Sequence, residues 1–426
     1  MPPAARVLGL ECLRCHELFP AGLHFAGCPR CRDAGVTVNL TVKLDLTGLA
    51  GLPAGQLSDP DAPRGMWRFR KLLPVAGQRP VTLGEGATPL VHLERLGRRL
   101  GLPRLYAKDE SRNPTWSYKD RLCSVAVTHA IESSARVVTI SSTGNHGAST
   151  AAYASRAGLA CVIFTLGSVP DTMKTLMQAY GAAVVACPTS ESRWALMRES
   201  VERLGWYPTS GFVLPPIGSN PYGIEGYKTL AYEVAEDLGW QAPDRIVVPS
   251  AYSDGLFGIW KGMMELQALG WIKDLPRMVA AEPFGPLAHA LERGLAAPEA
   301  VEGGQSVAFS IASRYGTYQG LTALRDSRGA GVRITDEGVF EAQRALAREE
   351  GIFVEPSSAT ALTAVLQLHA RRAIDPDELI VIVLTSGGLK DPGASRTWMP
   401  EVPPAPDHLD GVLAVLKESY GLELGG

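Results

Sequence analysis

Two hydrophobic periods alternate along most of the chain. Short runs rich in β-branched residues predict buried strands, and longer runs with apolar residues every three or four positions predict helices that cover them. This alternation favours an α/β fold in which two parallel sheets are covered on both faces. After residue 100 the expected strands lie at 105–108, 137–140, 161–165, 184–186, 246–248 and 379–384. The expected helices lie at 93–100, 122–131, 147–157, 172–180, 192–204, 226–238, 340–349 and 359–369.

The regular pattern is flanked by segments of different composition. An alternating stretch at 36–46 predicts a strand that leaves an N-terminal module, and residues 47–66, rich in Gly, Pro and Asp, predict a linker. Residues 400–406 are rich in proline and precede one short amphipathic helix. We therefore expect four parts. They are an N-terminal module at 1–46, a large domain at 67–125 and 215–400, a small mobile α/β domain at 126–214, and a tail helix at 401–426.

The overall composition is typical of a soluble globular protein, since 46% of the 426 residues are hydrophobic and 20% are charged. The net charge is −3 and the basic residues are scattered, which argues against a nucleic-acid-binding surface. No apolar run is long enough to cross a membrane, and the N-terminus does not resemble a signal peptide. Seven cysteines are too few for a disulfide scaffold of this size, so a cytoplasmic, reducing location is expected.

Four of the seven cysteines form two Cys-x-x-Cys pairs near the N-terminus, Cys12 with Cys15 and Cys28 with Cys31. Two such pairs at this separation can present four thiolates to one ion in the tetrahedral arrangement of structural zinc. The alternative is a set of free thiols that hold no metal. Few arginines and no aromatic platform accompany the cysteines, so this zinc-ribbon-like module is expected to be a structural cap.

Lys119 lies between an Asn-Pro turn signal and an apolar-periodic run that predicts a helix. Ser117 is placed to cap this helix, and Asp120 falls in its first turn, where acids are favoured. Lys119 would then stand at the positive end of the helix, which lowers the pKa of its amine. A neutral lysine amine is a nucleophile suited to Schiff-base chemistry. The alternative is an ordinary solvated lysine.

Ligands of open parallel sheets bind beyond the carboxyl ends of the strands, where this chain has three polar, glycine-containing loops. The first loop, 141–147, offers amides and hydroxyls at a helix N-terminus, which suit a carboxylate. Asn145 in this loop can reach a flat polar group beside that carboxylate. The alternative is an ordinary capped turn.

The second loop, 249–258, could cradle a phosphate through the backbone amides from Ser253 to Leu256 and the Ser253 hydroxyl. Asp254 would repel that phosphate unless its carboxylate points away. The third loop, 384–392, places Thr385 where it can hydrogen-bond a ligand in the crevice.

Six segments, taken together and in order, resemble the threonine synthase family within the fold-type II enzymes that depend on pyridoxal phosphate. They span the chain from about residue 80 to 395, and some relatives also carry an N-terminal cysteine ribbon. The lysine segment and the last segment are the most specific. The six are Gly84-Glu-Gly-Ala-Thr-Pro-Leu90, Asn113-Pro-Thr-Trp-Ser-Tyr-Lys-Asp-Arg121, Ser142-Thr-Gly-Asn-His146, Asn220-Pro-Tyr-Gly-Ile-Glu-Gly226, Gly351-Ile-Phe-Val-Glu-Pro-Ser358 and Leu384-Thr-Ser-Gly-Gly-Leu-Lys-Asp-Pro392.

The resemblance implies roles for these residues, a small amino-acid substrate and a homodimer. Lys119 would form the Schiff base with pyridoxal phosphate and move the α-proton of the substrate, and Asn145 would hydrogen-bond the phenolic oxygen of the cofactor. Thr385 would face the pyridine nitrogen, and a hydroxyl there favours elimination or replacement over transamination. The remaining residues bind anionic groups: Ser142, Thr143 and His146 the substrate carboxylate, and Ser253, Asp254, Gly255 and Leu256 the cofactor phosphate.

The chain departs from the family pattern at positions that bear on the substrate. Gly223 stands where threonine synthases are expected to have an arginine for the phosphate of O-phosphohomoserine, and arginine–phosphate pairs are strong. His146 replaces the usual threonine, as in serine/threonine dehydratases, and Ser253 and Asp254 occupy glycine positions of the phosphate loop. We therefore expect a lyase that catalyses β-elimination or β-replacement on a small amino acid. The alternatives are threonine synthase itself and a non-catalytic ligand-binding protein.

Overall fold

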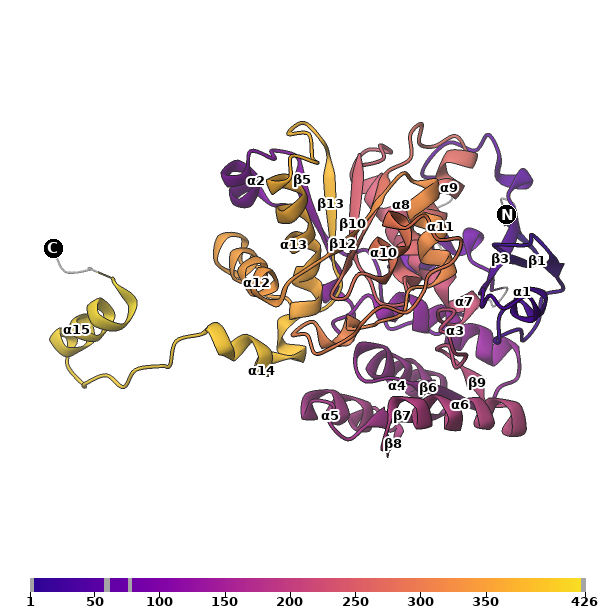
Figure 1. The fold of residues 1–426 in the computed structure, drawn as a ribbon, viewed down its shortest axis with the longest axis horizontal. Helices are drawn as coiled ribbons and strands as arrows, with labels where there is room; N and C mark the ends of the chain where they lie inside the picture. The colour runs from indigo at the N-terminus through magenta and orange to yellow at the C-terminus, as the bar shows by residue number, and fades with distance from the viewer. Residues whose placement is uncertain (1–3, 57–61, 76–78, 423–426) are drawn as a thin grey trace.

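A computed structural model describes residues 4–56, 62–75 and 79–422, and its strands form three sheets (Figure 1). The three-stranded sheet has the order β2 (Leu18–Phe19), β1 (Arg6–Cys12), β3 (Leu40–Asp45). The four-stranded sheet has the order β8 (Ala183–Cys187), β7 (Ala160–Leu166), β6 (Val137–Ser141), β9 (Tyr207–Pro208). The six-stranded sheet has the order β12 (Ala330–Arg333), β11 (Arg277–Glu282), β10 (Arg245–Pro249), β13 (Ile380–Leu384), β5 (Leu105–Asp109), β4 (Leu90–His92).

The helices connect and cover these strands. They are α1 (Pro29–Asp33), α2 (Glu94–Leu100), α3 (Lys119–Glu132), α4 (Asn145–Ala157), α5 (Asp171–Ala179), α6 (Ser190–Leu204), α7 (Pro221–Ile224), α8 (Lys228–Asp237), α9 (Asp254–Ala268), α10 (Pro286–Glu292), α11 (Tyr318–Asp326), α12 (Asp336–Glu350), α13 (Pro356–Ala370), α14 (Pro392–Ser395) and α15 (Leu409–Tyr420). Several begin two to four residues before the expected bounds, because the first turn is made of polar residues outside the apolar period.

The six strands expected after residue 100 are all confirmed, each within one residue of its expected bounds. Strands β11 and β12, which also belong to the six-stranded sheet, were not expected. This sheet is parallel except at β4, which pairs antiparallel with β5 at the edge. The expectation of two purely parallel sheets is therefore wrong for this sheet, since an antiparallel edge strand is a common addition to a parallel one.

The six-stranded sheet separates two hydrophobic cores, because successive strand residues point to opposite faces. On β10, Ile246 and Val248 enter the core beneath α3, α8 and α9, whereas Val247 enters the core beneath α2, α12 and α13. All five residues of β10 and of β13 are buried. The four-stranded sheet is parallel, with the larger part of its core under α4 and α5 and a smaller cluster on the α6 side.

The N-terminal sheet packs its inner face against Tyr222 in α7. The strand expected over 36–46 is partly wrong, because β3 covers only Leu40–Asp45. The preceding residues make other contacts: the Val38 carbonyl accepts from Cys28 N at 2.9 Å, and Asn39 Nδ2 donates to Ser219 O at 2.9 Å. Of the expected linker, Thr47–Leu49 forms a short 3-10 turn, and residues 57–61 lie outside the described residues.

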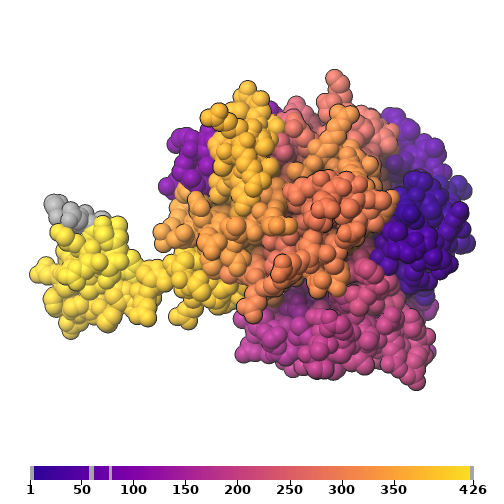
Figure 2. Space-filling view, viewed as in Figure 1, coloured from indigo at the N-terminus to yellow at the C-terminus, as the bar shows by residue number. Residues whose placement is uncertain are grey.

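Helix α15 stands apart from the rest of the molecule at the end of an extended segment (Figures 1 and 2). None of its residues is buried. Within the described ranges, no helix combines the length and the apolar character that a membrane crossing needs.

Candidate active site

The three loops expected at strand ends meet around one cavity of about 730 Å³. Beyond β6, β10 and β13 their residues line its wall together with Lys119 at the start of α3. Leu256 is the exception among the candidate residues, because its side chain is 1% exposed and packs in the core beneath α9. The candidate residues that line the cavity are Lys119, Ser142, Thr143, Asn145, His146, Ser253, Asp254, Gly255 and Thr385.

The amine of Lys119 has no carboxylate partner among the described residues. Its Nζ lies 4.9 Å from the centroid of the Tyr118 ring and 5.7 Å from that of Tyr227. Burial lowers the pKa of this amine, but the nearby groups Tyr118, Asp254 and Cys123 outweigh burial, and the pKa is raised. The expected lowered pKa is therefore wrong for the free lysine, because the helix terminus is only one part of the charge around it.

The start of α3 is held by Ser117, as expected, and by a neighbouring loop. Ser117 Oγ accepts from Lys119 N at 3.3 Å, which satisfies an amide of the first turn as a capping side chain does. Tyr118, between them, already has helical φ and ψ. The segment is tied to the third loop, since Tyr118 N donates to Thr385 O at 2.9 Å. Lys119 is thus positioned both by the Ser117 hydroxyl and by the residue that follows β13.

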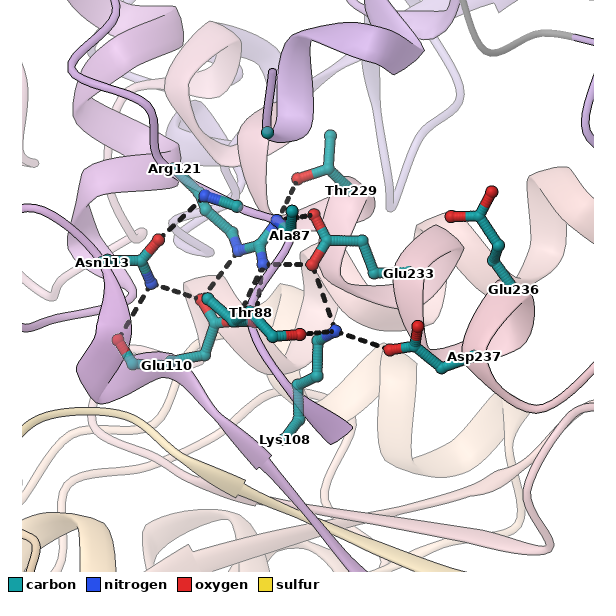
Figure 3. A network of polar contacts seen from close by, with 12 residues as sticks. Ala87, Thr88, Lys108, Glu110, Asn113, Arg121, Thr229, Glu233, Glu236 and Asp237 are labelled. Atoms are coloured by element: carbon teal, nitrogen blue, oxygen red, sulfur yellow. Dashed lines mark hydrogen bonds and ion pairs between the residues drawn. The ribbon is translucent and has the colours of Figure 1, made fainter. Parts of the chain in front are cut away.

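A buried ion network anchors the first turn of α3 (Figure 3). Arg121 Nε and Nη2 donate to the Glu110 carboxylate at 2.7 and 2.8 Å, and Nη1 and Nη2 donate to Glu233 at 2.9 and 2.7 Å. Lys108 of β5 forms an ion pair with Glu233, with 3.1 Å between Lys108 Nζ and Glu233 Oε2. Burial by itself would raise the pKa of Glu233, but Arg121 and Lys108 hold it well below its usual value. The network links β5 and α8 to α3, the helix whose first residue is Lys119.

Some polar groups of the first loop form hydrogen bonds within the loop itself. Ser142 Oγ accepts from Gly144 N at 3.2 Å and from Gly147 N at 3.0 Å, so Ser142 organises the turn and keeps only its hydroxyl hydrogen for a ligand. His146 is 9% exposed and its Nε2 has no hydrogen-bond partner. Burial and the charge of Lys119 hold the pKa of His146 well below its usual value. The imidazole is therefore neutral at pH 7 and free to bind a ligand.

Asn145 pairs with a carboxylate that the sequence did not single out. Its Nδ2 donates to both oxygens of Glu355, at 2.9 and 3.0 Å, and its Oδ1 accepts from Ser386 Oγ at 3.3 Å. Burial raises the pKa of Glu355, and the hydrogen bonds from Asn145 offset part of that effect. Glu355 lies in a segment that resembles the family, but its contact with the cavity appears only once β13 and α13 are in place.

The second loop leaves a set of free amides at the start of α9. The first intrahelical bond runs from Phe257 N to Ser253 O, so the amides of Asp254, Gly255 and Leu256 have no acceptor within the helix. Ser253 adopts a left-handed conformation with φ 62°, and its Oγ lies 3.0 Å from Ser250 Oγ. This donor set fits a phosphate, even though the Leu256 side chain is remote from the cavity.

The carboxylate of Asp254 is occupied by donors from other segments. It accepts from Ser219 N at 2.9 Å, from Ser219 Oγ at 2.6 Å and from Gln319 Nε2 at 2.7 Å. Gly218 makes this approach possible, since a Cβ there would lie 2.6 Å from Asp254 Oδ1. The repulsion expected from an acid in the phosphate loop is reduced by these three bonds.

Thr385 lines the cavity from the end of β13, where its Oγ1 lies 2.9 Å from Ser358 Oγ. A hydroxyl that shares a hydrogen bond with another hydroxyl can either donate or accept toward a ring nitrogen. The amine of Lys119, the α9 amides and this hydroxyl together form a donor set that fits a phosphorylated heteroaromatic aldehyde such as pyridoxal phosphate.

Arg193 is a second cavity residue that sequence reasoning missed. It comes from α6 and is buried, although α6 is otherwise a largely polar surface helix. No motif surrounds it, so no signal in the sequence could have found it.

The four N-terminal cysteines meet as expected. Their sulfur atoms all lie within 4.8 Å of one another, with Cys12 Sγ 3.6 Å from Cys31 Sγ and Cys15 Sγ 3.7 Å from Cys28 Sγ. Four sulfurs bound at about 2.3 Å around a tetrahedral ion would be about 3.8 Å apart. The geometry therefore fits a tetrahedral thiolate site.

The chain matches the family described as pyridoxal-phosphate dependent enzymes over residues 81–386. Threonine synthase from Methanocaldococcus jannaschii is 36% identical over 342 residues, which cover 78% of this chain and 82% of that protein. Threonine synthase from Mycobacterium bovis is 35% identical over 354 residues, which cover 82% of this chain and 94% of that protein.

Two solved structures share the fold at low identity. Maize serine racemase superposes with a TM-score of 0.62 at 22% identity, covering 71% of this chain and 88% of its own. Threonine deaminase isoform 2 from Solanum lycopersicum gives a TM-score of 0.61 at 19% identity, covering 70% of this chain and 79% of its own.

Proposed function

The chain belongs to the family of pyridoxal-phosphate-dependent enzymes, as a threonine synthase-like member of fold type II, and on that premise we propose that it catalyses β-elimination or β-replacement on a small amino acid. Bound pyridoxal phosphate would act as an electron sink for the substrate's α-carbon. Support for the site assignment comes from the convergence of Lys119 and the three loops on one cavity.

Each residue of the proposed site has a task that follows from its contacts. Lys119 Nζ, held by the tie between Tyr118 and Thr385, would carry the cofactor and move the α-proton. The α9 amides would bind the phosphate, and Thr385 Oγ1 would meet the ring nitrogen. Neutral His146, with its unpartnered Nε2, would join Ser142 and Thr143 around the substrate carboxylate.

We propose the same division of the chain that the sequence suggests. Residues 126–214, which carry the four-stranded sheet, would form a small domain that closes over the substrate and excludes water. Residues 67–125 and 215–400 would hold the cofactor, and a second copy of the chain would complete a homodimer.

The environment of Gly223 is the reason that we prefer β-elimination or β-replacement over a reaction with O-phosphohomoserine. Gly223 is buried in α7, and a Cβ there would lie 3.0 Å from Leu122 Cγ and 3.1 Å from Ala126 Cβ. The position therefore carries no side chain that could bind a second phosphate, and a side chain placed there would have to displace α3 by a few tenths of an ångström. Threonine synthase activity is the second candidate, and the identity of about one third to threonine synthases favours it.

One experiment separates the two candidates. The protein loaded with pyridoxal phosphate is mixed with L-serine, L-threonine, O-phospho-L-serine and O-phosphohomoserine, and its visible spectrum and products are followed. We expect spectral change with ammonia and a 2-oxo acid from one of the first three, or a replacement product if a thiol is added. Efficient release of threonine and phosphate from O-phosphohomoserine, without oxo acid from the others, would instead establish the second candidate.

We propose that zinc occupies the four-cysteine site and stabilises the N-terminal module. Metal analysis should find about one zinc per chain, and Cys15→Ser should lose it, because a tetrahedral site needs all four thiolates. Limited proteolysis should then cut the variant within the module. Cys187→Ser, at a buried cysteine outside the site, is the control. Equal metal content in the two variants would refute the proposal.

A further inference from the structure

Arg193 is a buried cation that forms no ion pair within the part of the chain that the structure describes. It is 8% exposed and lines the active-site cavity. Its Nε is buried and has no hydrogen-bond partner, and among the described residues its guanidinium takes part in no ion pair. Burying an unpaired charge is unfavourable, so such a group in a cavity is a candidate to bind a ligand of opposite charge.

The surroundings of Arg193 do not neutralise it. Burial lowers its pKa, while Tyr252, Cys187 and Glu191 are the groups whose negative charge would raise it. Tyr252 and Cys187 are neutral at pH 7, since burial raises the pKa of both. Glu191 is exposed to solvent and forms no ion pair with Arg193. The cavity therefore carries at this point a positive charge that no ion pair among the described residues neutralises.

We propose that Arg193 selects amino-acid substrates that carry a second anionic group, a carboxylate or a phosphate, on the side chain. The inference rests on the proposed function and adds to it the chemical class of the substrate. A guanidinium binds either anion through two parallel hydrogen bonds, which gives both affinity and orientation.

The position of Arg193 favours the substrate over the cofactor as the source of the anion. The cofactor phosphate already has the free amides of Asp254, Gly255 and Leu256 at the start of α9. Arg193 belongs to α6, which packs on the four-stranded sheet. The ring of its neighbour Trp194 lies edge-on to the ring of Tyr252, with 6.2 Å between the ring centroids. A group on α6 would reach the substrate when the two sheets enclose it.

Equilibrium binding tests the inference independently of turnover. The holoenzyme is reduced with borohydride, which fixes the cofactor and stops the reaction, and binding of O-phospho-L-serine, L-aspartate and L-serine is measured by calorimetry. We expect one of the two anionic amino acids to bind about 10- to 100-fold more tightly than L-serine. Which of them binds more tightly identifies phosphate or carboxylate as the preferred group.

Two variants of the same helix provide the matched comparison. Arg193→Gln should abolish the preference, whereas Arg198→Gln, at an exposed position of α6 outside the cavity lining, should retain it. Arg193→Lys should retain only part, since lysine cannot form the paired hydrogen bonds. Thermal melting checks that all variants fold.

Three results would overturn the inference. They are equal binding of all three amino acids by the unsubstituted protein, a preference that survives Arg193→Gln, and loss of pyridoxal-phosphate affinity as the main effect of Arg193→Gln. Absence of turnover with every amino acid would count against the proposed function, while the binding comparison would still decide the role of Arg193.

Discussion

Replacing Lys119 with alanine is expected to reduce turnover by about 10⁴-fold or more, the upper range for a positioned proton-transfer group. The physical reason is that Lys119, at the start of α3, lines the same cavity as the loop proposed for the cofactor phosphate and the loop proposed for the substrate. Lys119→Arg should fail equally, because a guanidinium keeps the charge but is not a nucleophile. Steady-state kinetics with the substrate found in the spectral screen measures the loss.

The same variants should lose the covalent link to the cofactor. Borohydride treatment of the unsubstituted holoenzyme, followed by peptide mass analysis, should place the cofactor on the peptide that contains Lys119. Lys273→Ala, at an exposed position, is the control and should behave as the unsubstituted protein. A modified lysine elsewhere in the chain would refute the assignment of Lys119.

Replacing Arg121 with leucine is expected to lower the free energy of unfolding by about 3–5 kcal/mol, as removal of one partner from a buried ion network typically does. The substitution would leave the buried carboxylates of Glu110 and Glu233 with only part of their partners (Figure 3). Denaturant unfolding measures the change. Arg121→Lys should recover only part of it, because one ammonium cannot form the four donations that join the guanidinium to these carboxylates.

The pH dependence of unfolding gives an independent check on this network. The folded-state pKa of Glu233 lies below its unfolded value, so its contribution is full above about pH 4.3 and is lost as the pH falls toward the folded pKa. Arg121→Leu should weaken this acid dependence. Arg198→Leu, on the surface of α6, should change stability by no more than about 0.5 kcal/mol. Equal losses in the two leucine variants would contradict the role of the network.

The local spacing of hydrophobic residues was sufficient to predict most of the architecture. Alternating hydrophobic periods predicted the central strands β10 and β13, because a strand buried on both faces must be apolar throughout. Short strands gave no such signal: β12 has four residues and β9 has two, so their pairing depends on the neighbouring strands. The antiparallel edge strand β4 was missed for the same reason.

The sequence by itself was enough to recognise the family and, through it, the cofactor, since Lys119 and the loops 141–147 and 249–258 are local features of strand ends and helix starts. Only the tertiary structure decided the electrostatic environment of these residues. Asp254 accepts hydrogen bonds from Ser219 and Gln319, which lie far from it in the sequence. Arg193 is buried with no ion-pair partner among the described residues, which no local pattern around it indicates. Hydrogen bonding within a turn can be read from neighbouring residues, whereas burial and electrostatic environment depend on which distant segments pack together.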